Sequence, residues 1–179
     1  FIWNNDLKKE FRIDAASRFS YPARSLDLKF NYALITNYTD LGINALPSQY
    51  DGVLSVVSVA AHKDFKAWKF HLSTDILVQQ SSNSAILDLP LFSTRTTGYF
   101  EHLFRFESTN GSLNTQFGVE MIYNTLYHPY NYMPATGRFY RQNSVSAGNY
   151  PFLNAFLNVK LKRTRIFIML DHLNSGMMG

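Results

Sequence analysis

Residues 113–127 read LNTQFGVEMIYNTLY, and every second side chain from Leu113 onward is aliphatic, aromatic or threonine. The side chains between them are mostly amides, an acid and a glycine. Because side chains alternate between the two faces of a strand, this pattern predicts one β-strand with an apolar and a polar face. Strands of soluble domains typically have about five or six residues, and this pattern lasts for roughly fifteen. The fold must therefore accommodate a long strand that is apolar on one face only.

The alternation recurs along the chain. It is clear in four further segments, and three more are β-branched or aromatic and bounded by turn residues without keeping to one parity. We therefore predict eight strands, near residues 11–19, 25–38, 52–61, 67–79, 95–107, 113–127, 152–162 and 165–173.

The connections between these segments alternate in length. Short ones are predicted at YPAR (21–24), HKDF (62–65), TNG (109–111) and KRT (162–164), and long ones at 39–51, 80–90 and 128–150. No segment has a convincing helical period. The sequence predicts a single all-β domain over residues 1–179, an antiparallel up-and-down meander of about eight long strands with tight turns at one end and long loops at the other.

Composition restricts the class of protein. Aromatic residues make up 16% of the 179 residues, yet the mean hydropathy is −0.17, so apolar residues are interleaved with polar ones. No apolar stretch approaches the roughly 18 to 20 residues of a membrane-spanning helix. The net charge of +4 is scattered rather than gathered in a basic arm, which argues against nucleic-acid binding. The absence of cysteine excludes disulfides and thiolate metal sites.

Long strands with one apolar face are typical of a membrane β-barrel. In a bilayer every backbone hydrogen bond must be satisfied internally, so a sheet survives there only when closed, and a tilted strand needs about 9 to 11 residues to cross. Lipid-facing positions are then apolar and lumen-facing positions can be polar. We predict part or all of a transmembrane β-barrel. A soluble β-sandwich or barrel with its aromatic residues inside shows the same alternation and remains an alternative.

The alternation also predicts which side chains face the lumen of the barrel and which face lipid. Lumen-facing candidates are the charged residues Asp27, Lys29, Lys69, Asp75, Glu101, Arg105, Glu120, Lys160, Arg165 and Asp171. Lipid-facing candidates are Phe30, Trp68, Phe70, Phe117, Val119 and Leu157. Opposed charges on adjacent strands either pair and stiffen the wall or set a field across the lumen, and rings of charged side chains are how pores select ions.

The stretch YPFLNAFLNVKLKRTRIFIMLDHLNSGMMG (150–179) resembles the penultimate hairpin of the putative porins of Bacteroidota-type outer membranes. The resemblance implies a non-enzymatic porin of the bacterial outer membrane that lets small hydrophilic solutes diffuse passively, with membrane lipid as its surroundings and no cofactor. It also implies strands beyond Gly179, so eight is a lower bound. Since the chain starts at Phe1, we expect an internal fragment or processed chain, whose edge strands at 11–19 and 165–173 need partners. Homo-oligomerisation stays open.

The sequence gives little support for a metal site or a catalytic site. The five histidines lie on separate hairpins without metal-ligand spacing, so no metal site is expected, and His102 near Ser93 is the one pair to check for hydrolase chemistry. NYT (37–39) and NGS (110–112) are interpreted as turns. Two further alternatives are a soluble β-barrel that binds an apolar ligand and a structural outer-membrane barrel with a plugged lumen. The long loop also carries four aromatic residues, Tyr130, Tyr132, Phe139 and Tyr140. We expect them to stack on sugars, to fold inward and narrow a pore, or to anchor the loop at the membrane interface.

Overall fold

The computed structural model describes residues 6–106 and 111–176. Its elements are β1 (Phe11–Tyr21), the 3-10 turn η1 (Pro22–Arg24), β2 (Leu26–Thr36), β3 (Thr39–Leu41), β4 (Pro47–Gln49), β5 (Val53–Ala67), β6 (Phe70–Ser81), β7 (Phe92–Phe106), β8 (Gly111–Asn124), β9 (Asn131–Met133), β10 (Arg138–Tyr140), β11 (Phe152–Leu161) and β12 (Thr164–Leu170). Within the described ranges, no helix has the length and apolar character needed to cross a membrane.

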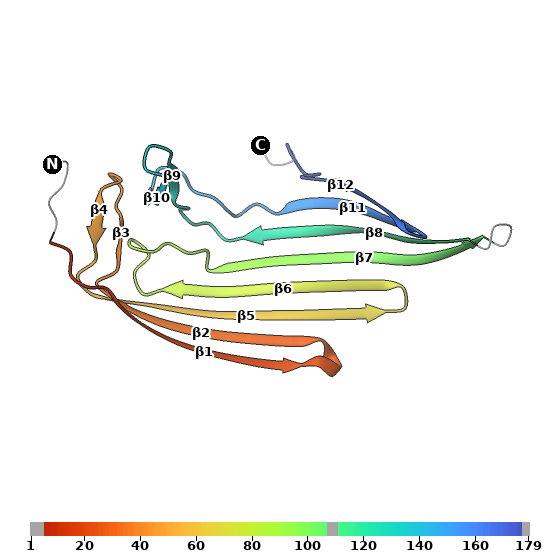
Figure 1. Ribbon diagram of the computed structural model, residues 1–179, viewed down its shortest axis with the longest axis horizontal. Helices are drawn as coiled ribbons and strands as arrows, with labels where there is room; N and C mark the ends of the chain where they lie inside the picture. The colour runs from red at the N-terminus through yellow and green to blue at the C-terminus, as the bar shows by residue number, and fades with distance from the viewer. Residues whose placement is uncertain (1–5, 107–110, 177–179) are drawn as a thin grey trace.

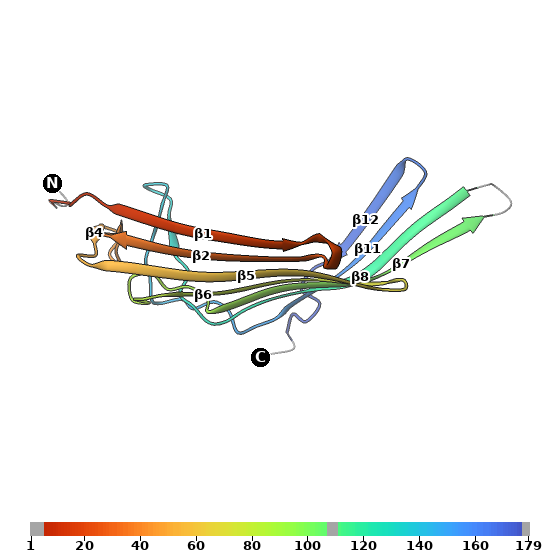
Figure 2. The same ribbon diagram turned by 90° about the horizontal axis from the view of Figure 1, so that it is seen from below.

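Eight long strands form one antiparallel sheet in the order β1-β2-β5-β6-β7-β8-β11-β12 (Figure 1). Each long strand pairs with the long strand before it, which confirms the predicted all-β meander. The sheet is curved and stays open (Figure 2). Among the described strands, β1 and β12 each have a neighbour on one side only. The long connections carry two small hairpins, β3 with β4 and β9 with β10.

One predicted turn is wrong. The segment HKDF (62–65) lies inside β5, which continues for 15 residues, and the chain reverses at Trp68 and Lys69 instead. The charges of this segment mimic turn chemistry, but Asp64 belongs to one face of the strand while Phe65 continues the apolar face. Trp68 adopts φ 55°, the left-handed conformation of the reversal.

The other short connections agree better with the sequence. YPAR is a turn, in which Pro22 starts η1 and Ser25 closes it with φ 47°. Within KRT, Lys162 and Arg163 form the turn between β11 and β12, and Thr164 begins β12. Of the predicted turn TNG (109–111), Thr109 and Asn110 lie outside the described residues, and Gly111 begins β8. The last predicted strand is shorter than expected, because β12 ends at Leu170.

Candidate functional site

The register of the sheet defines two faces. Directly opposed residues on paired strands share a face, so the set that contains Phe117 of β8 also contains Phe100 of β7 and Leu157 of β11. Followed through all seven pairings, this set comprises the odd residues of β1, β5, β8 and β11 and the even residues of β2, β6, β7 and β12. We call it the apolar face and the complementary set the polar face.

The apolar face carries a single Lys, Arg, Asp or Glu within the eight strands, Lys63. That ammonium donates to the carbonyl of Arg24 and lies 5.1 Å from the ring centre of Phe65. Large side chains of this face are exposed, as shown by Phe70 at 57% and Phe117 at 56%. Soluble proteins rarely expose so extensive an apolar surface.

The polar face holds the buried residues. The strand residues that are buried are Ala33, Ile35, Leu54, Glu120 and Asn154, all of which lie on this face. The sheet is curved (Figure 2), and side chains on the inner side of a curved sheet converge and shield one another. From the burial of these residues we infer that the polar face is the inner one. Burial is thus inverted relative to a soluble protein, in which the apolar face is covered.

Most charges on the β1 to β6 part of the polar face are paired, although Lys29 and Lys66 form no ion pair with a described residue. Arg18 on β1 reaches across to Asp27 on β2, with NH2 2.5 Å from Oδ2. Arg12 pairs along its own strand with Asp14 at 2.8 Å. His62 on β5 lies 2.8 Å from Asp75 on β6, and also 3.3 Å from Asp64. The Arg18–Asp27 and His62–Asp75 pairs link neighbouring strands of the sheet.

A second set of polar contacts crosses β7, β8 and β11. Arg95 NH2 lies 2.5 Å from Glu120, whose other carboxylate oxygen accepts a hydrogen bond from Asn154 at 3.4 Å. Nearer the short turns, Glu101 accepts hydrogen bonds from Asn114 at 2.9 Å and from Gln116 at 3.3 Å. The carboxylates of this region are therefore held by partners on neighbouring strands.

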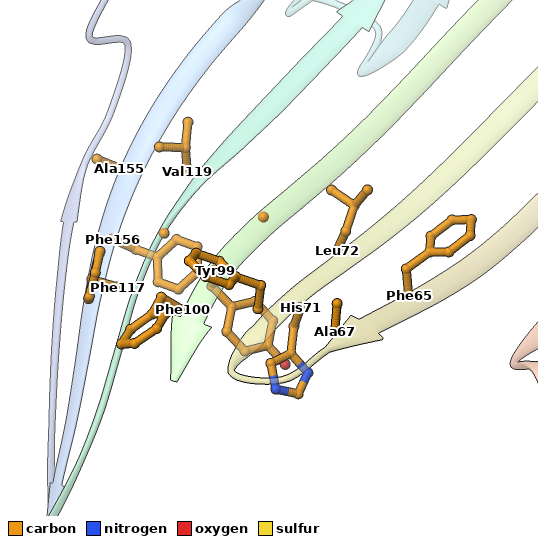
Figure 3. Close-up of a pocket in the computed structure, with 13 residues that line it drawn as sticks. Phe65, Ala67, His71, Leu72, Tyr99, Phe100, Phe117, Val119, Ala155 and Phe156 are labelled. Carbon is orange, nitrogen blue, oxygen red and sulfur yellow. The ribbon is translucent and has the colours of Figure 1, made fainter. Parts of the chain in front are cut away.

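A row of rings also crosses the polar face. His71 and Tyr99 stack with ring centres 4.7 Å apart and planes 3° apart, and the Phe156 ring lies 6.3 Å from that of Tyr99 (Figure 3). Gly118 is directly opposite both Tyr99 and Phe156. A Cβ there would lie 2.4 Å from the Gly98 carbonyl oxygen and 2.6 Å from Tyr99 Cβ, so only glycine fits without displacement. The strand pattern did not reveal this row, although a glycine in a strand signals close approach.

Behind this row, the apolar face has a hollow of about 760 Å³ (Figure 3). Gly98 and the small side chains of Ala67 and Ala155 leave the space, and larger apolar side chains form its walls, among them Phe65, Leu72, Phe100, Phe117 and Val119.

The register assigns most of the candidate lumen-facing and lipid-facing residues to one or other face of the sheet. Eight charged candidates lie on the polar face: Asp27, Lys29, Asp75, Glu101, Arg105, Glu120, Lys160 and Arg165. Five apolar candidates lie on the apolar face: Phe30, Phe70, Phe117, Val119 and Leu157. Which face meets lipid and which meets water stays a prediction.

Three candidates lie outside the strands. Trp68 and Lys69 form the turn between β5 and β6. The Lys69 ammonium contacts His102 and lies 5.0 Å from the Trp68 ring centre and 5.9 Å from that of Phe100, so its expected place on the polar face is wrong. Asp171 follows the end of β12.

The structure does not support the candidate hydrolase pair or a metal site. Ser93 and His102 both belong to β7 but lie on opposite faces, and the rise of a strand separates them by roughly 30 Å. In the part of the chain that the structure describes, no three His, Asp or Glu side chains gather to hold a metal ion.

The three long loops are tied together by a half-buried cluster. Arg141 Nε lies 2.6 Å from Asp40 Oδ2, and the two side chains are only 17% and 7% exposed. The Arg141 guanidinium also donates to the Ala85 carbonyl at 3.0 Å. Residues 39–51, 82–91 and 125–151 thus meet at Arg141, and the second and third of these loops meet again where His128 lies 2.8 Å from Asp88. Sequence spacing gives no signal for contacts between such distant segments.

Tyrosine residues complete the cluster. The Tyr130 hydroxyl lies 3.4 Å from the Tyr38 hydroxyl and 3.4 Å from Asp40. Burial raises the pKa of Asp40, which the nearby Arg141 opposes, and burial also raises the pKa of Tyr130 above its ordinary range. The remaining loop aromatics pack locally, with the rings of Tyr132 and Phe139 5.3 Å apart and the Tyr140 hydroxyl accepting from Asn131.

Comparisons with known proteins agree with this geometry. The family model described as "Putative porin" matches residues 1–179, the whole chain. No curated protein and no solved structure is found to match the chain. A curved antiparallel sheet with an exposed apolar face and a charged inner face is the kind of wall from which a porin-like β-barrel is built. The chain belongs to the putative porin family.

Proposed function

We propose that the protein is a bacterial outer-membrane β-barrel that lets small hydrophilic solutes cross by passive diffusion, without catalysis and without a cofactor. The observation that carries the proposal is the segregation of side chains by one continuous register. Across eight strands, the apolar face has one charged residue and the polar face has all the others. Hydrocarbon suits the first face and water suits the second.

Two alternatives make different use of the same sheet. A soluble barrel that binds an apolar ligand needs the apolar face on the inner side, whereas the buried strand residues lie on the polar face. A plugged structural barrel is favoured by one observation, the packing of the long loops around the contact of Arg141 with Asp40. Loops joined in this way narrow the mouth of a barrel, and solute size then decides whether diffusion continues.

Electrical recording of the full-length protein in a planar lipid bilayer tests the proposal. A pore gives stepwise conductance, and vesicles that contain it swell in small sugars. A protein that needs detergent and migrates in a heat-modifiable way, but gives no conductance, is a plugged barrel. A monomer that stays soluble without detergent supports the ligand-binding barrel. Either of the last two results contradicts passive diffusion.

A further inference from the structure

The charged side chains of the polar face are paired to different extents in different parts of the sheet. Its β1 to β6 part has cations beside acids, as described above. At the end of β11 and the start of β12 the sequence reads KLKRTR (160–165), with four cations and no acid. Among the described residues, no carboxylate forms an ion pair with any of these four, nor with Arg105 of the same end of β7. Within the described part of the chain, this end of β7, β11 and β12 therefore carries positive charge that no ion pair neutralises.

Two of the cations share a cavity. Lys160 directly opposes Arg165 across the β11–β12 pairing, and both line a hollow of about 400 Å³. The other polar-face residues around it are the amides Asn114, Gln116 and Asn158 and the ring of Phe167. No acid lines this hollow. Like charges directly opposed on neighbouring strands destabilise a sheet, so an anion placed between them lowers the free energy of the site.

The donors suit an oxyanion. A guanidinium offers a planar fork that matches carboxylate or phosphate, and an ammonium offers three donors. Each amide nitrogen around the hollow already donates once, to Glu101 or to Gln116, and has a second N–H. The nearest acid in the register is Glu101, which opposes Gln116. Its carboxylate accepts hydrogen bonds from Asn114 and Gln116 and does not line the hollow.

We propose that the hollow between Lys160 and Arg165 binds small oxyanions, phosphates or carboxylates, during their passage along the polar face. The inference rests on the proposed function, because it takes the polar face to be the wall of a pore. It adds a solute class, small hydrophilic anions, and a site on the wall that concentrates them. Both cations lie on the polar face, which favours a free solute over a lipid headgroup as the occupant.

Inorganic phosphate added to the full-length protein in a phosphatidylcholine bilayer tests the site. We expect permeability to favour anions in a KCl gradient, and phosphate to reduce the chloride current in a saturable manner. The double variant K160Q/R165Q should require about tenfold more phosphate, or more, for the same reduction, because it removes two charge-assisted contacts. The matched control K162Q/R163Q removes the same charge from the adjacent turn, outside the hollow, and should keep the reduction.

The outcomes separate the two proposals. Normal conductance with no phosphate effect, or an equal loss in both double variants, overturns the anion site and leaves the pore intact. Absence of conductance in every variant overturns the pore. Calorimetric titration of phosphate into the detergent-solubilised protein then still tests the site, and heat that K160Q/R165Q does not abolish contradicts it. A phosphate effect that appears only with anionic lipid assigns the cations to headgroups instead and also overturns the proposal.

Discussion

Two glycines on neighbouring strands face opposite sides of the sheet and have opposite tolerance for a side chain. A Cβ at Gly118 would lie 2.4 Å from a backbone oxygen, whereas a Cβ at Gly98 would have as its nearest neighbour Leu72 Cδ1, at 3.7 Å. We expect Gly118→Ala to lower the free energy of unfolding by about 1–3 kcal/mol, the usual cost of overpacking. Gly98→Ala should stay within about 0.5 kcal/mol of the wild type. Urea unfolding in detergent micelles measures both, and equal stability of the two variants would contradict the close approach of Tyr99 and Gly118.

Titration of the Asp40 carboxyl makes the stability of the packed loops depend on pH. Its pKa is raised above the ordinary 3.8 by burial, so the packed loops bind this proton more tightly than unfolded loops do. In the interval between the ordinary and the raised pKa, packing therefore becomes more stable as the pH falls. Arg141 and Tyr130 face the carboxyl and are its immediate charged and titratable neighbours.

Amide hydrogen exchange of residues 37–51 and 125–150 measures this effect. After correction for intrinsic rates, we expect stronger protection as the pH is lowered from 7 toward 4. Asp40→Asn serves as the control, because its side chain cannot titrate and the part of the pH-dependent protection that comes from Asp40 should be absent. Protection that falls with pH to the same extent in both proteins would show that Asp40 does not govern loop packing.

At the scale of single strands, β5 allows the two faces to be compared at adjacent positions. Val59 lies on the apolar face and is 44% exposed, while Ser58 lies on the polar face. An arginine near the bilayer midplane costs about 2–4 kcal/mol, and less in the lumen. We expect V59R to destabilise the protein in lipid vesicles by that amount and S58R by less than about 1 kcal/mol. Equal effects of the two substitutions would mean that neither face of β5 meets hydrocarbon.

The strands were predictable to the extent that local alternation determines them. The apolar and polar faces of β8 follow from its period-two pattern. The pairings then extend each face to the neighbouring strands, because directly opposed residues lie on the same side of the sheet. The end of β5 was not predictable, since the charges of residues 62–65 resemble those of a turn although His62 and Asp64 continue the polar face of the strand. The contacts of Arg141 with Asp40 and of Tyr99 with Gly118 depend on tertiary pairing, and no local pattern specifies the partner.

At the scale of the whole molecule, the sheet needs partners at both edges. In a bilayer an unpaired strand edge leaves backbone groups unsatisfied at a cost of several kcal/mol each, so β1 and β12 must pair with other strands or with each other. A closed barrel of eight strands has an interior filled by its own side chains. A conducting pore therefore requires strands beyond the described sheet, in the same polypeptide or in another copy.

Spin labels in lipid vesicles test the inside-out arrangement most directly. The chain has no cysteine, so single cysteines can be placed without a background at adjacent positions of three strands: Val59 and Ser58, Phe117 and Gln116, Leu157 and Asn158. We expect labels at Val59, Phe117 and Leu157 to collide with dissolved oxygen, and labels at Ser58, Gln116 and Asn158 to collide with a water-soluble nickel chelate. The reversed pattern, with the first set reached by nickel and the second by oxygen, would contradict the inside-out arrangement.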